Sequence, residues 1–270
     1  MNQFDQFQNA LLLEPIAVNK YRVNLDSRYF VGKTPHGGYL NALMHKALIL
    51  SVPHTVAISS SIQYLNRIEV NDVVLEVEVF KTSKGSSSGL VKLYQDKKIC
   101  TVFNAICSDF EHMKGFDGLL TNPPDLYKNT PKRDYKNLNY DVISPGFTPS
   151  FINQLSCTVH PNHAWWDRDM DEADAEARCS AYMKMEGGVP DQFVLSFYVD
   201  VAPPVVSNKY GPLGWIPTYS LTTHIRQIPT TEIVFVDFVA KDINKGYFEQ
   251  DCNIWDLNEN LVASSRQLTR

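Results

Sequence analysis

The stretch GGYLNALMHKALIL, from Gly37 to Leu50, indicates the architecture because a set of strand-like runs comes directly after it. Its apolar residues recur at helical spacing from Tyr39 onward, and Pro53 stops the predicted helix. The four strand-like runs, separated by turn-forming residues, are Thr55–Leu65, Val73–Thr82, Leu90–Gln95 and Ile99–Ser108. One helix before several consecutive strands is typical of an antiparallel sheet and not of alternating βαβ units.

The second half of the chain repeats this order. Strand-like segments at Phe151–His160 and Ala177–Met185 precede an apolar helix from Gln192 to about Ala202, which ends at Pro203-Pro204. Four strand-like runs come again after it, at Thr218–Gln227, Ile233–Lys241, Gly246–Trp255 and Leu261–Leu268. The sequence therefore predicts an α+β fold with two antiparallel sheets, each wrapped around a central helix. The two sheets could pair side by side, which would hide one edge strand of each.

A change in composition separates the two halves. Between Phe110 and Pro149 the chain is rich in proline, asparagine and lysine and shows little hydrophobic periodicity. We expect an N-terminal domain over residues 1–112, a linker over 113–148 and a C-terminal domain over 149–270.

Charge and hydrophobicity exclude several classes of protein. The 270-residue chain carries a net charge of −5 and has no basic stripe, which argues against nucleic acid as a partner. No apolar run approaches the roughly 20 residues of a membrane helix, and the N-terminus does not resemble a secretory signal. The five cysteines form no CxxC pair and indicate an intracellular protein with reduced thiols. The C-terminal tripeptide is no peroxisomal signal, so we expect a cytoplasmic protein.

Two clusters resemble sets of metal ligands. Asp167, Asp169 and Asp171 have the spacing of a calcium loop, but the loop lacks the glycine and the closing glutamate that calcium sites use. His160 and His163 lack a third ligand at a suitable spacing, so we expect them to be surface histidines. We predict neither a metal nor a cofactor.

Three segments carry a resemblance to a known family. They are Pro35–Leu40, Gly214–Arg226 and Leu261–Leu268, supported by Gly246–Glu249 and Trp255-Asp256. In this order and spacing they resemble the double-hotdog, thioesterase-like superfamily, which includes acyl-CoA thioesterases of the bacterial type II. The resemblance spans nearly the whole chain, from about Tyr21 to Arg270.

The resemblance implies hydrolysis of a fatty acyl-CoA by water, without a covalent intermediate on the enzyme. The catalytic trio of the family matches Asp200, Thr218 and Gln267, all in the second half. The segment Gly37-Gly38-Tyr39 is expected to bind the acyl-CoA substrate. The resemblance also makes a homodimer plausible.

The chemistry of these residue types agrees with this role. Asp200 is the only acid between Asp191 and Glu232 and falls within the predicted apolar helix, so burial should raise its pKa and make it a better general base. Thr218 and Gln267 can donate hydrogen bonds that orient a water or a carbonyl. Backbone N–H groups at the start of the helix near Gly37-Gly38 can polarise the thioester oxygen. Strict alternation would place Thr218 on one strand face with Ser220, Thr222, His224 and Arg226, a face that could be solvated.

Two other functions remain open. The second residue after the family's threonine is often acidic but is Ser220 here, which motivates a non-catalytic protein that binds acyl-CoA or an acyl chain. Hydration or dehydration of an acyl thioester would need a histidine beside the acid, and we find none near Asp200 in the sequence. Because Ser27 to Ile68 contains no Asp or Glu, we predict one active site per chain. The length and class of the acyl group cannot be read from the sequence.

Overall fold

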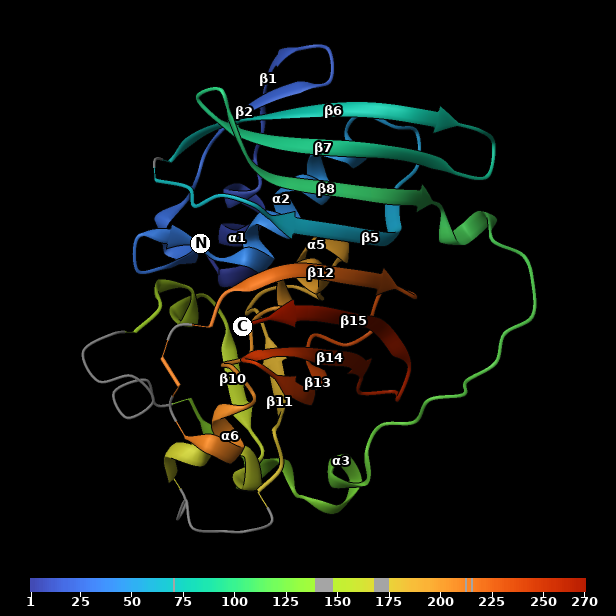
Figure 1. Cartoon of the computed structure of the whole chain (residues 1–270). Coiled ribbons are helices and arrows are strands. Elements are labelled where there is room, and N and C mark those ends of the chain that lie inside the picture. The colour runs from blue at the N-terminus through green and yellow to red at the C-terminus, as the bar shows by residue number, and fades with distance from the viewer. Residues whose placement is uncertain (70, 139–147, 168–174, 212, 215) are drawn as a thin grey trace.

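The computed structural model describes the whole chain except residues 70, 139–147, 168–174, 212 and 215. Within the described part, thirteen strands form one antiparallel sheet that curves around the central helices α2 (Gly37–Ile49) and α5 (Gln192–Tyr198) (Figure 1). The strand order from edge to edge is β1-β2-β6-β7-β8-β5-β12-β15-β14-β13-β11-β10-β9. This architecture confirms the predicted α+β fold with one central helix in each half.

The described part of the molecule also contains three further α-helices, short 3₁₀ turns and the individual strands. The helices are α1 (Gln3–Ala10), α3 (Asp125–Asn129) and α6 (Ser207–Tyr210). The strands of the first half are β1 (Glu14–Ala17), β2 (Lys20–Asn24), β3 (Phe30–Val31), β4 (Thr34–Pro35), β5 (Val56–Tyr64), β6 (Asp72–Thr82), β7 (Ser87–Gln95) and β8 (Lys98–Ser108). The later strands are β9 (Lys136–Asn137), β10 (Ser156–Val159), β11 (Arg178–Lys184), β12 (Thr218–Ile225), β13 (Val234–Asn244), β14 (Tyr247–Asp256) and β15 (Leu261–Thr269).

The two halves are joined by the antiparallel pairing of β5 with β12. Ser61 lies opposite Thr222, and Ile62 lies opposite Leu221, so the backbone hydrogen bonds of one half continue into the other. Neither strand is left as an exposed edge, as the sequence suggested. The pairing also fixes the position of each central helix relative to the other.

Helix α2 is buried on nearly every side because it lies between the sheet and α5. Its start is set by His36, whose Nδ1 accepts a hydrogen bond from the N–H of Gly38 at 3.1 Å, so the helix begins two residues before the predicted Tyr39. Asn41 donates from its side-chain nitrogen to the carbonyl oxygen of Ser196 on α5 at 2.9 Å. This bond ties the central helices together.

Several elements differ from the expectation. Helix α5 ends at Tyr198 and not near Ala202, because the N–H groups of Asp200 and Val201 donate to the carbonyl oxygens three residues back, at Phe197 and Tyr198, in a tightened turn. The expected strand Phe151–His160 instead begins as a 3₁₀ turn, Ser150–Gln154, before β10. Helix α1 was not anticipated. Its Phe7 ring packs 5.2 Å from that of Phe197, centroid to centroid, so the start of the chain contacts α5.

The described part of residues 113–148 covers the outer face of the second half's sheet. The Tyr127 ring packs on Phe235, and the Tyr135 ring packs on Tyr182. These four rings belong to, or pack against, a hydrophobic cluster separate from the main core. No helix in the described part of the chain is long and apolar enough to cross a membrane.

Candidate active site

Asp200 lies in the turn after α5, two residues beyond the last helical residue, at the junction of the two halves. Its backbone N–H donates to the carbonyl oxygen of Phe197 at 3.2 Å, and only 8% of its side chain is exposed. The carboxylate faces the start of α2, where a Cβ added to Gly37 would lie 2.5 Å from Asp200 Oδ2. The absence of a side chain at Gly37 therefore allows the acid of one half to touch the helix start of the other.

The environment of Asp200 favours a carboxyl group that titrates near neutrality. Burial raises its pKa to about 7, against opposing contributions from the N–H of Gly38 and the hydroxyl of Thr218. The Thr218 hydroxyl donates to Asp200 Oδ1 over 3.5 Å, a long hydrogen bond. A carboxyl with such a pKa can accept a proton at physiological pH.

Thr218 reaches Asp200 because β12 is irregular at its start. Thr218 lies opposite Thr269, but Ser220 lies opposite Leu268, so the register shifts between Thr218 and Ser220. Beyond the shift Leu221 is buried, and Ser220 therefore faces away from the core. The expectation that Thr218 shares a face with Ser220 and Thr222 is wrong, since the extra residue reverses the alternation.

Gln267 lies on the inner face of β15, as its alternation with exposed Arg266 and Leu268 requires. It is 8% exposed and lies opposite Leu221 on one side and Gln250 on the other. Within the described residues, Gln267 Oε1 is buried without a hydrogen-bond partner, and the structure gives no contact between Gln267 and Asp200. The amide thus points into the second half, and no described protein group donates a hydrogen bond to its oxygen.

The residues predicted to bind substrate have different surroundings. Gly37 and Gly38 both lie against the Asp200 turn, and a Cβ on Gly38 would lie 2.5 Å from the carbonyl oxygen of Phe197. The Tyr39 side chain instead points toward α1, where its hydroxyl donates to the carbonyl oxygen of Ala10 at 2.9 Å. Any contact of Tyr39 with a ligand beside Asp200 would therefore involve its backbone.

Two residues that the sequence analysis missed also surround Asp200. His36 Nε2 lies 3.8 Å from Asp200 Oδ2, so the statement that no histidine lies near Asp200 is wrong. Tyr64, on β5, is partly buried and donates from its hydroxyl to the carbonyl oxygen of Gly37 at 2.7 Å. Burial, and then the charge of Asp200, raise the Tyr64 pKa well above its usual value. The only signal in the sequence is that His36 directly precedes the Gly37-Gly38 pair.

His160 and His163 are buried, at 4% and 5% exposure, and the expectation of surface histidines is wrong. Thr130 Oγ1 lies 2.8 Å from His160 Nε2, and the N–H of Ser180 donates to His163 Nδ1 at 3.1 Å. Among the described residues no group of three His, Cys, Asp or Glu side chains could hold a metal. Asp169 and Asp171 of the acidic loop, and Trp215 of the second family segment, lie outside the described residues.

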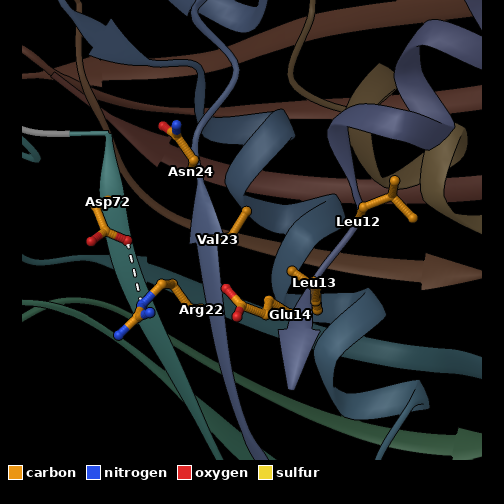
Figure 2. A pocket seen from close by; sticks show the side chains of 7 residues that line it. All are labelled: Leu12, Leu13, Glu14, Arg22, Val23, Asn24 and Asp72. Carbon is orange, nitrogen blue, oxygen red and sulfur yellow. Dashed lines mark ion pairs between the residues drawn. The ribbon is translucent and has the colours of Figure 1, made fainter. Parts of the chain in front are cut away.

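A surface cavity of about 350 Å³ lies elsewhere, beside β1 and β2 of the first half (Figure 2). It is lined by Leu12, Leu13, Glu14, Arg22, Val23, Asn24 and Asp72. The charged groups Arg22 and Asp72 form an ion pair at one side of it, with 3.9 Å between Nε and Oδ1 (Figure 2). None of these residues is among those around Asp200, so this cavity is separate from the candidate active site.

Comparisons with known proteins agree with the two-part architecture. The family model of the acyl-CoA thioesterase N-terminal domain matches residues 25–108, and that of the acyl-CoA thioesterase C-terminal domain matches residues 128–270. Paired hotdog units with these two domains define a thioesterase-type protein. The chain belongs to the acyl-CoA thioesterase family. No curated protein matches the sequence.

Solved structures show the same fold across nearly the whole chain. A protein of Thermobifida fusca assigned as a thioesterase II is 21% identical, with a TM-score of 0.84 and coverage of 98% of this chain and 97% of its own. A hot dog protein of unknown function from Alicyclobacillus acidocaldarius is 18% identical, with a TM-score of 0.82 and the same coverage. An acyl-CoA thioesterase II from Mycobacterium marinum is 14% identical, with a TM-score of 0.69 and coverage of 97% and 96%. At these identities the similarity establishes the double-hotdog fold alone.

Proposed function

We propose that this protein hydrolyses a fatty acyl-CoA to the free acid and CoA, with Asp200 as the general base. The observation that carries the proposal is the buried carboxyl of Asp200, whose pKa burial raises to about 7, against the glycine start of α2. Membership of the acyl-CoA thioesterase family supports acyl-CoA as the substrate.

In the proposed reaction Asp200 removes a proton from a water molecule while the water oxygen attacks the thioester carbonyl carbon. The C–S bond then breaks, and CoA leaves as a thiolate that takes up the proton that Asp200 removed from the water, which returns Asp200 to its ionised form. Thr218 lies beside one oxygen of the carboxylate, and we propose that Gln267 orients the water or the carbonyl through its amide, whose oxygen has no hydrogen-bond partner among the described residues. Backbone N–H groups of the first turn of α2 would polarise the carbonyl oxygen.

The test is release of free thiol from a panel of short, medium, long and aromatic acyl-CoAs, with Asp200→Asn beside the wild type. We expect the wild type to hydrolyse acyl-CoA, with a rate that falls as the pH drops below about 7. We expect the rate of the variant to be lower by at least about a hundredfold. Activity unchanged in Asp200→Asn would contradict the role of Asp200. No hydrolysis of any substrate would favour the second candidate, a protein that binds acyl-CoA or an acyl chain, which the departure at Ser220 motivates.

The contact between His36 and Asp200 also bears on acyl-thioester dehydration, in which a histidine removes a proton next to the carbonyl. Such a histidine needs a lone pair directed at the substrate. Nδ1 of His36 accepts from the N–H of Gly38, so the ring proton is on Nε2, the nitrogen near Asp200. This tautomer argues against His36 as the base. The homodimer that the resemblance implies remains a proposal, which light scattering of the purified protein would test.

A further inference from the structure

His36 belongs to the first half of the chain but lies against the catalytic candidate of the second. Only 7% of its side chain is exposed, and its Nε2 lies 3.8 Å from Asp200 Oδ2. Its ring is held by aromatic neighbours, with centroids 4.3 Å from Phe151 and 5.3 Å from Phe197. The imidazole is therefore packed in one orientation, with Nε2 beside Asp200.

The hydrogen bond at Nδ1 defines which nitrogen of the His36 ring carries the proton. The backbone N–H of Gly38 can only donate, so Nδ1 must be the acceptor of their 3.1 Å hydrogen bond. Burial lowers the pKa of His36 to about 3, although a hydrogen bond with the backbone of Asp200 acts in the opposite direction, so the ring is neutral at physiological pH. A neutral ring with an occupied Nδ1 carries its hydrogen on Nε2.

We propose that His36 is a positioning residue whose Nε2–H orients the carboxylate of Asp200 toward the attacking water. This inference rests on the proposed thioesterase function. Each carboxylate oxygen of Asp200 then has a neighbour from a different half of the chain. Thr218 of the second half lies beside Oδ1, and His36 of the first half lies beside Oδ2. The 3.8 Å separation exceeds a formed hydrogen bond, and catalytic hydrogen bonds of this kind commonly shorten when substrate binds.

A neutral donor suits this position better than a charged one. A histidinium beside Asp200 would strongly favour the carboxylate and lower its basicity, whereas a neutral N–H orients it with a smaller effect. In the described part of the chain, the titratable groups that the structure brings to Asp200 are His36 and Tyr64, and the phenol of Tyr64 is directed to Gly37. His36 is thus the side chain of the first half that can donate to the acid.

Two variants with amide side chains distinguish the roles of the two ring nitrogens of His36. In His36→Asn the short side chain keeps an acceptor for the N–H of Gly38 but has no donor at the position of Nε2. In His36→Gln the longer amide places an N–H near the position of Nε2 and loses the cap. The measurements are kcat, KM and the pH profile of thiol release, with the thermal midpoint of each variant as the check on folding.

We expect His36→Asn to lose roughly 10- to 100-fold in kcat with little change in KM, the range for a lost hydrogen bond to a charged group. Its acidic limb should move to higher pH, because the carboxylate loses a donor that favours its charged form. His36→Gln should retain most of the activity and the wild-type limb. Equal kcat and limb in all three proteins, or a loss confined to His36→Gln, would overturn the proposal and leave His36 as a helix cap.

A measurement without turnover keeps this inference distinct from the proposed function. Carboxyl ¹³C NMR can follow the titration of Asp200 in the wild type and in both variants with a non-hydrolysable acyl-CoA thioether bound, the state in which the hydrogen bond is expected to form. A higher Asp200 pKa in His36→Asn than in His36→Gln supports the contact even if the wild type hydrolyses nothing, a result that would overturn only the proposed function. Identical titrations would overturn the role of His36.

Discussion

The hydroxyl of Tyr64 donates a 2.7 Å hydrogen bond to the carbonyl oxygen of Gly37, 27 positions earlier in the chain. The bond joins the end of β5 to the first turn of α2, where Asp200 Oδ2 also lies. Since burial keeps the phenol protonated, Tyr64 is a permanent donor there. The helix start that faces the acid is thereby held to the strand that joins the two halves.

Replacing Tyr64 by Phe should weaken this attachment. We expect the free energy of unfolding to fall by about 1 kcal/mol, the usual contribution of one hydrogen bond, and kcat/KM to fall with it. Urea unfolding and thiol release measure the two effects. Tyr210→Phe is the control, since Tyr210 is 56% exposed, and it should change neither. Equal behaviour of the two variants would contradict the importance of the bond.

Gly37→Ala should abolish activity, because the added Cβ would lie 2.5 Å from Asp200 Oδ2 and displace the carboxylate. In a helix alanine is otherwise favoured over glycine by about 1 kcal/mol, so a large loss of stability would come from the collision and not from the backbone. We expect a loss of at least about a hundredfold in kcat/KM, because a displacement of about 1 Å of a catalytic group can cost that much. Gly85→Ala, at a position with open space around it, should behave as the wild type. An active Gly37→Ala protein would show that the carboxylate is not confined as described.

Asp200→Asn should stabilise the protein, and the gain should depend on pH. The folded state raises the pKa of Asp200 to about 7, whereas an unfolded chain titrates near about 4. Between these values the folded protein holds a proton that the unfolded chain releases, so the contribution of Asp200 to stability falls as pH rises. The variant lacks this loss, and its thermal midpoint should exceed that of the wild type more at about pH 8 than at about pH 4.5. An equal difference at both pH values would mean that the Asp200 pKa is not raised.

A single turnover should yield one equivalent of product per chain. The acid near the junction comes from the second half, and Ser27 to Ile68 supplies no carboxylate for a second site. Rapid mixing of the enzyme with a few equivalents of acyl-CoA per chain, quenched within the first turnover, measures the product formed per chain. Two equivalents per chain would require a second base that the sequence does not suggest.

Local patterns in the sequence were sufficient for most of the fold. The spacing of apolar residues predicted α2, and the alternation of apolar and polar residues predicted β6. Both patterns depend only on residues that are neighbours in the sequence. The approach of His36 to Asp200 is not such a property, since it arises only when α2 and α5 pack together. The register shift at Thr218 depends on pairing with β15 and was equally invisible. Asp200 was assigned because it matches the catalytic acid of the family, and its place as a lone acid beside apolar residues agreed with that match.

The pairing of β5 with β12 also determines when the candidate active site comes into being. Ser61 and Thr222 face each other across this pair although 161 positions separate them. Contacts between segments so distant in sequence form slowly, and domains commonly fold before they dock. Each half can build its hairpins alone, but Asp200 meets His36 and Gly37 only after docking. During refolding, catalytic activity would therefore return after the circular dichroism of the strands, and a chain with folded but undocked halves would look native in that signal and remain inert.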